Sequence, residues 1–208
     1  MRYILVCFLM MVAPFAKGQE IVVGLSDNEI GIDTFFDGSE LFVYGAIRPR
    51  ASFLQSLDDP HDVIITISSP REPVTVRRKD RRFGIWVNVD AAEIDMVPHF
   101  YAVATTGPFD QVITPAEDAR YAISVPNMIQ PNGATNQDAF YAAVQRIKAD
   151  KGLYVQLDRS VDLRADTLFS TSITLPANLI EGTYDLRIFI ARDGHVVGRY
   201  EGDIAVQK

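Results

Sequence analysis

The chain has 208 residues, 48% of them hydrophobic, and a formal net charge of −7. This length and composition allow one or two domains with a sizeable core, and they argue against a disordered chain. The acidic balance argues against a general binder of nucleic acid or anionic membranes, because such proteins carry a basic excess.

The first 18 residues have the pattern of a secretory signal peptide. Arg2 provides a positive start, residues 3–12 are apolar, and the small residues Ala16 and Gly18 end the segment. The apolar run is too short to span a bilayer, which needs about 20 residues. We expect export with cleavage after Gly18, or alternatively after Ala16; a buried N-terminal element is the other interpretation of the run.

Cleavage after Gly18 would remove Cys7, the only cysteine, and the loss of Arg2 and Lys17 would change the net charge from −7 to −9. The mature chain would then contain no thiol, which excludes a cysteine nucleophile, a disulfide and a cysteine metal site. An exported protein without disulfides depends on its hydrophobic core for stability.

Residues 19–107 have the pattern of an antiparallel β-sandwich. Apolar or alternating runs recur at intervals of about ten residues, and Gly, Pro and Asp turns separate them. This spacing predicts an immunoglobulin-like β-sandwich. The predicted strands are residues 21–25, 29–33, 41–47, 62–68, 74–78, 83–89 and 99–105.

Residues 108–151 are predicted to form a helical connector. Thr114 and Pro115 suit the N-cap and first residue of a short helix. Residues 136–151 carry apolar side chains at spacings of three and four, with Asn136 as a cap and Gly152 as the end.

A β pattern returns in residues 152–208. Residues 167–174, 183–191 and 196–206 are predicted strands, and Asp193-Gly194 predicts a hairpin turn between the last two. A unit with so few strands has little stability by itself. This segment therefore either forms a smaller C-terminal β unit or completes the first sandwich. The predicted fold class is therefore mainly β.

The sequence contains no GxSxG, SxxK, Walker A or GxGxxG pattern, so it predicts no nucleophile and no phosphate-binding loop. His61, His99 and His195 are not spaced as a metal site and are interpreted as exposed loop residues. The acidic groups around Asp58 and Asp158 lack the calcium-loop pattern and are interpreted as solvated charge. We expect a protein that is not an enzyme and binds no metal or cofactor. Acid–base catalysis by two carboxylates from distant positions stays open as an alternative.

The feature that suggests a function is a cationic stretch followed by the only tryptophan, Trp86. In a hairpin, Arg77 and Lys79 would point to one face and Arg78 to the other, so the cluster cannot all be buried. We interpret it as a site for an anion or an acidic partner, with Trp86 as an aromatic anchor. The candidate residues are Arg77, Arg78, Lys79, Arg81, Arg82 and Trp86.

Other interpretations of these residues stay open. Charges at a hairpin tip keep sheet edges from aggregating. Trp86 lies between Ile85 and Val87, which fits a core position. A membrane-proximal placement, with the cations facing anionic headgroups, is a further alternative.

Four stretches, residues 24–47, 69–88, 98–105 and 168–194, resemble the alphaproteobacterial putative transmembrane protein family, Alph_Pro_TM. The most specific parts are VRRK-x-R-x-x-GIWVN and FYAVA. The resemblance implies a signal peptide, an extracytoplasmic β-rich region and one C-terminal transmembrane helix, but no activity. It also implies genes beside sulfite-exporter-like permeases, which is an association and not a mechanism.

The sequence departs from that pattern because it stops at Lys208, where the family's membrane helix would begin. No mature segment has the roughly 18 consecutive apolar residues of a spanning helix. We expect a chain trimmed before that helix, with a freely periplasmic protein as the alternative.

Together these features predict an exported binding or accessory module at the periplasmic face of the inner membrane. Its expected partner is an inner-membrane protein, with a permease as the candidate, and it would contact the membrane through a helix beyond Lys208. No nucleic-acid partner is expected. The alternatives are an envelope structural or assembly protein that self-associates and an enzyme with an unrecognised site.

Overall fold

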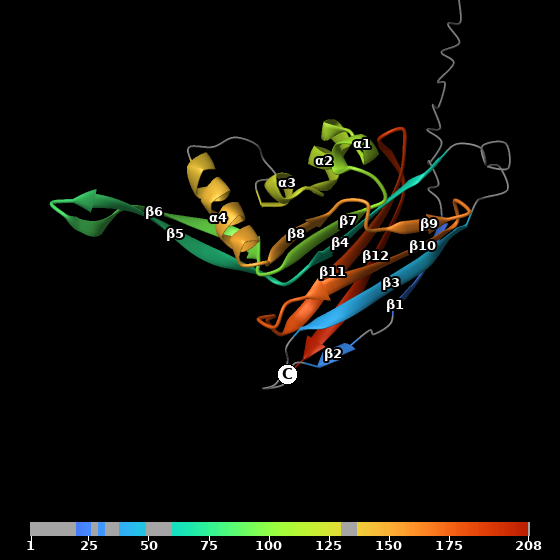
Figure 1. Ribbon diagram of the computed structural model, residues 1–208, viewed down its shortest axis with the longest axis horizontal. Coiled ribbons are helices and arrows are strands. Elements are labelled where there is room, and N and C mark those ends of the chain that lie inside the picture. The colour runs from blue at the N-terminus through green and yellow to red at the C-terminus, as the bar shows by residue number, and fades with distance from the viewer. Residues whose placement is uncertain (1–19, 26–28, 32–37, 49–59, 130–136, 208) are drawn as a thin grey trace, which may run out of the picture.

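The computed structural model describes residues 20–25, 29–31, 38–48, 60–129 and 137–207. These residues form two stacked β-sheets, a layer of helices on the outer face of one sheet, and a long hairpin that projects from the body (Figure 1). The prediction of a mainly β, mostly antiparallel fold is confirmed. The predicted signal peptide, residues 1–18, lies outside the described residues.

The first sheet has four antiparallel strands in the order β1-β3-β10-β9. In β10, Phe169, Thr171, Ile173 and Leu175 are buried and alternate with more exposed residues, as expected for a strand with one face on a core. The strands of this sheet are β1 (Glu20–Leu25), β3 (Ser39–Arg48), β9 (Asp162–Arg164) and β10 (Leu168–Leu175).

The second sheet has six strands in the order β2-β12-β11-β4-β7-β8, and its centre, formed by β4, β7 and the end of β11, is buried on both faces. In β4, Val63 and Ile65 pack in the core between the sheets, whereas Ile64 packs under the helices. Among the described strand pairs of this sheet, β2–β12 and β7–β8 are parallel, and the other three are antiparallel. Its strands are β2 (Glu29–Gly31), β4 (Asp62–Ser68), β7 (Tyr101–Thr105), β8 (Tyr154–Leu157), β11 (Gly182–Arg192) and β12 (His195–Gln207).

Strands from both ends of the chain share both sheets. Strand β10 pairs with β3, and β11 pairs with β4, so residues 152–208 complete the sheets that the N-terminal strands begin. The order β1-β3-β10-β9 opposite β12-β11-β4-β7 is also the order of strands A-B-E-D and G-F-C-C′ in immunoglobulin domains. The immunoglobulin-like assignment stays a prediction, and this strand order supports it.

Four helices cover the outer face of the second sheet (Figure 1). The predicted cap of the second helix is confirmed, since the Thr114 hydroxyl accepts a hydrogen bond from the Glu117 amide. Gly152 lies just beyond the last helix with φ +67°, as predicted, whereas Asn136 lies outside the described residues. None of the helices in the described ranges is long and apolar enough to cross a bilayer. The helices are α1 (Phe109–Val112), α2 (Pro115–Tyr121), α3 (Val125–Ile129) and α4 (Asp138–Asp150).

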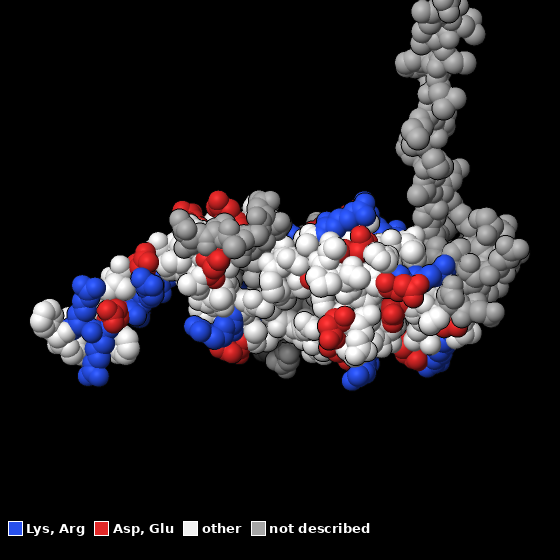
Figure 2. Space-filling view, turned by 90° about the horizontal axis from the view of Figure 1, so that it is seen from above, with Lys and Arg blue, Asp and Glu red and all other residues white. Residues whose placement is uncertain are grey.

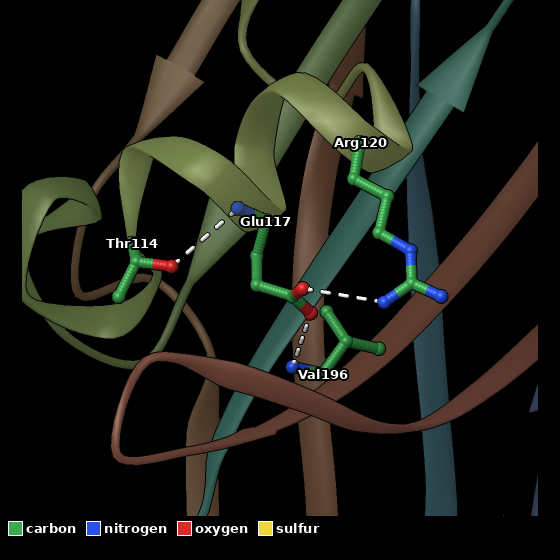
Figure 3. A network of polar contacts seen from close by, with 4 residues as sticks. All are labelled: Thr114, Glu117, Arg120 and Val196. Atoms are coloured by element: carbon green, nitrogen blue, oxygen red, sulfur yellow. Dashed lines mark hydrogen bonds and ion pairs between the residues drawn. The ribbon is translucent and has the colours of Figure 1, made fainter.

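Glu117 joins α2 to the hairpin of β11 and β12 (Figure 3). One of its carboxylate oxygens accepts the Val196 amide at 3.0 Å, and the other lies 3.5 Å from a terminal nitrogen of Arg120. The predicted hairpin turn at residues 193–194 is confirmed, with φ values of +50° and +76° that fit a type I′ turn.

Arg187 on β11 holds the end of α2 against the sheet. Its guanidinium donates to the Tyr121 and Ala122 carbonyls at 2.9 and 3.1 Å, and to the Thr66 and Tyr101 hydroxyls at 3.2 Å. The carbonyls at a helix C-terminus lack partners within the helix and favour a nearby cation. This half-buried arginine therefore fastens the helical layer to the sheet.

Replacing Arg187 with Met should lower the free energy of unfolding by about 2–3 kcal/mol, because the α2 carbonyls would lose their charged donor. Urea unfolding measures this change. The matched control is Arg199→Met, whose side chain is exposed and lies 3.5 Å from Glu201 in a surface ion pair; its effect should stay within about 0.5 kcal/mol. Equal urea midpoints for the two variants would contradict the role of Arg187.

Candidate partner-binding site

Strands β5 (Arg71–Arg82) and β6 (Ile85–Pro98) form a two-stranded ribbon inserted between β4 and β7. At its base, the Ser69 amide donates to the Phe100 carbonyl, so the ribbon continues the β4–β7 pair. Val76, Ile94 and Val97 at its root are buried in the core beneath the helices. The root thus fixes the ribbon to the body, and the rest projects away from it (Figure 1).

The projecting part, residues 77–91, is termed the finger. All of its residues are exposed except the half-buried Val87. At about 3.3 Å per strand residue, it is about 20 Å long. A two-stranded ribbon is marginally stable by itself, so the finger depends on its buried root.

The finger ends in a two-residue turn of Phe83 and Gly84, between the paired residues Arg82 and Ile85. The φ values of +51° and +86° fit a type I′ turn. The prediction of a strand that begins at Phe83 is wrong, because Phe83 and Gly84 form the turn. Phe-Gly is not a usual pair for this turn, so the sequence carried no signal for it.

Phe83 is a costly residue at this position. A left-handed backbone costs a non-glycine residue about 1–2 kcal/mol, and the Phe83 side chain is fully exposed, so no packing offsets the strain. Backbone strain that packing does not offset is a reason to test Phe83 for a function.

Trp86 is also exposed, at 69% of its full surface, and Ile85 at 64%. The interpretation of Trp86 as a core residue is therefore wrong. Trp86 lies next to the turn, where no other element covers the ribbon in the described part of the chain.

The two faces of the finger differ in charge, as the strand register shows. Arg77, Lys79 and Arg81 alternate along β5 and share one face, and Arg81 pairs with Trp86 across the ribbon. This set of four residues is termed the basic face. Among the described residues none of its three cations has an ion-pair partner. The predicted separation of Arg77 and Lys79 from Arg78 is confirmed.

The opposite face carries its own counterions and is termed the compensated face. Arg78 lies 3.2 Å from the Asp90 carboxylate, and Arg82 lies 3.7 Å from the Asp80 carboxylate. With five cations and these two carboxylates, the finger has a net charge of +3 in a chain of −7. Figure 2 shows Lys and Arg side chains gathered over the projecting hairpin.

A groove of about 370 Å³ lies between the start of the finger and α4. Its lining includes Phe140, Arg146 and Ile147 from α4. From β5 it includes Val76, Arg77, Arg78 and Lys79. Sequence reasoning missed Arg146, because only the packing of α4 beside β5 brings it to the cationic stretch.

The three histidines lie in different environments. His61 is buried beside Arg192, so its prediction as an exposed residue is wrong, because the end of β11 covers it. His99 is half-buried, with Nε2 3.0 Å from the Asn178 carbonyl, and His195 is exposed at the start of β12. Within the described ranges, no three His, Cys, Asp or Glu side chains gather where they could hold a metal ion.

The fold and the finger define a β-sandwich protein with a projecting basic hairpin. A family described as "Putative transmembrane protein (Alph_Pro_TM)" matches residues 20–208, and the chain belongs to that family, as the resemblance indicated. The description is consistent with association with a membrane. No curated protein matches the chain.

Replacing Phe83 with Asn should raise the free energy of unfolding by up to about 1 kcal/mol, because Asn-Gly is a favoured type I′ pair. Thermal unfolding measures the change. Asp193→Asn in the other type I′ turn is the control and should change stability little, since Asp-Gly is already favoured. A destabilised Phe83→Asn variant would show that Phe83 supports the fold.

Burial, and then the positive charge of Lys148, lower the pKa of His99 below its ordinary value of 6.5, with Lys151 adding to this and Glu72 opposing it. The unfolded chain therefore binds the proton more readily, and stability should fall as the pH drops through about 6.5. Replacing His99 with Gln should remove part of that fall. Urea unfolding at neutral and mildly acidic pH measures it, and equal losses in both proteins would contradict the prediction.

Proposed function

We propose that this protein is an exported, non-catalytic accessory module that is held at the periplasmic face of the inner membrane and binds an inner-membrane protein there. The observation that carries the proposal is the basic face, which presents Trp86 and three cations on a projecting ribbon; these cations have no ion-pair partner in the described part of the chain. A permease is the candidate partner.

The uneven pairing of the charges favours binding over mere solubility. If the cations only kept the ribbon from aggregating, the placement of the two aspartates would not matter. Instead, Asp80 and Asp90 both lie on the compensated face, which leaves Arg77, Lys79 and Arg81 with free donors. Arginine forks bind carboxylates in bidentate geometry, so the basic face suits an acidic surface.

The surroundings of the basic face fit the same role. Trp86 beside the cations provides the type of aromatic anchor that dominates many interfaces. Because the root is buried, the basic face is presented on a fixed support, which reduces the entropy lost on binding.

The second candidate is a self-associating envelope protein, and one observation favours it. Val22, Phe42, Tyr44 and Leu168 are exposed, and by strand register they share the outer face of the first sheet. A dimer would cover such a patch. Monomeric behaviour in solution would set this candidate aside.

A photocrosslinking amino acid at Asn88 tests the proposal, because Asn88 pairs with Lys79 on the basic face. In native membranes of cells that produce the full-length protein, we expect one integral membrane protein to be crosslinked. The same group at Glu201, an exposed residue of β12, is the positional control and should not capture it.

Two double variants remove the same number of charges and separate the faces. Lys79→Ser with Arg81→Ser should lower the crosslink yield about tenfold or more, because charge-assisted hydrogen bonds are lost. Arg78→Ser with Arg82→Ser should lower it much less. Equal losses, or equal capture from Glu201, would count against a partner at the basic face.

A further inference from the structure

The tip of the finger exposes one apolar side chain at the turn and one on each face. Phe83 occupies the turn, Ile85 lies on the compensated face beside its partner Arg82, and Trp86 lies on the basic face beside its partner Arg81. All three are well exposed. Apolar side chains that point to both faces and to the end of a ribbon suit a surrounding apolar medium.

Cations stand beside and behind these side chains. Arg82 lies level with Ile85, Arg81 lies level with Trp86, and Lys79 and Arg78 lie farther from the turn. Along the axis of the finger Phe83 thus comes first, and the long arginine side chains can extend back from the apolar residues toward the headgroups. A bilayer surface presents the complementary order, with anionic headgroups outside and acyl chains below, and Trp side chains favour that interface.

We infer that the tip of the finger inserts into the surface of an anionic lipid bilayer, with Phe83, Ile85 and Trp86 among the acyl chains and the cations at the lipid phosphates. The inference goes beyond the proposed function, because it gives Phe83 and Ile85 a role and places Trp86 and the cations against a lipid surface rather than a protein. It also accounts for Phe83, whose side chain contributes no packing within the described protein and sits on a strained backbone.

The acidic body does not oppose this contact. The chain has a net charge of −7, but the finger has five cations and two carboxylates and keeps the body about 20 Å from the tip. Charges are largely screened beyond a Debye length of about 8 Å at physiological ionic strength. A membrane in contact with the tip alone is therefore attracted by the positive charge of the finger. The negative charge of the body, about 20 Å away, is largely screened.

The single tryptophan makes the test direct, because the fluorescence of Trp86 is the only tryptophan signal in the chain. The protein is titrated with vesicles of phosphatidylglycerol and phosphatidylethanolamine, and in parallel with vesicles of phosphatidylcholine. We expect the emission to move to shorter wavelength with the anionic vesicles, brominated acyl chains to quench it, and salt to weaken the binding. Removing one cation should lower the affinity about fivefold.

The variants Phe83→Ser and Ile85→Ser should each weaken vesicle binding on the order of tenfold, because each loses an apolar side chain that would enter the lipid. Both side chains are exposed, so neither supports the fold. Leu168→Ser is the matched control, since Leu168 is an exposed apolar residue on the first sheet, and it should bind as the unchanged protein does.

The outcomes separate this inference from the proposed function. No change in Trp86 emission with anionic vesicles at low salt overturns the inference, even if Asn88 still crosslinks to a membrane protein. A change that appears only when solubilised membrane proteins are added, and never with vesicles, overturns it in favour of a protein pocket. A change with vesicles but no crosslinked protein supports the inference and counts against the proposed function.

Discussion

The centre of the second sheet is buried on both faces, and the rest of the structure depends on this constraint. One face packs against the first sheet, and the other needs a cover of its own, since Ile64 of β4 points away from the core between the sheets. Helices α1–α4 supply that cover, and Arg187 fastens α2 to it. Val76 and Ile94 at the root of the ribbon belong to the same core. The burial that completes the fold therefore also holds the finger in place.

The finger itself shows a division between stability and binding. Its root contributes to a core, whereas beyond Val76 almost nothing is buried and Phe83 adds strain. Its charge is also divided, because two carboxylates neutralise one face and leave the other basic. The basic face and the apolar tip share Trp86, whereas Arg77 and Lys79 lie farther from the turn than Phe83 and Ile85 do. The negative charge of the whole chain conceals this local positive pole.

Short-range patterns in the sequence were enough to predict several elements. Strand β4 coincides with residues 62–68, since a run of β-branched residues between turn signals has few other conformations. The cap at Thr114 and the turn at Asp193-Gly194 were also predicted, because each depends on neighbouring residues only. The alternation of Arg77 and Arg78 between faces follows from strand geometry, whatever the ribbon packs against.

The exposure of the candidate site was decided by the tertiary structure. The sequence around Ile85 and Trp86 fits a buried strand as well as a projecting one. Only the positions of the helices show that no described residue covers these two side chains. The sequence determined which residues lie on each face of a strand, because backbone geometry acts over a few residues. Which faces are covered, which strands complete each sheet, and that Arg146 joins the finger depend on contacts between distant segments. Packing of the whole chain sets those contacts, and no local pattern carries them.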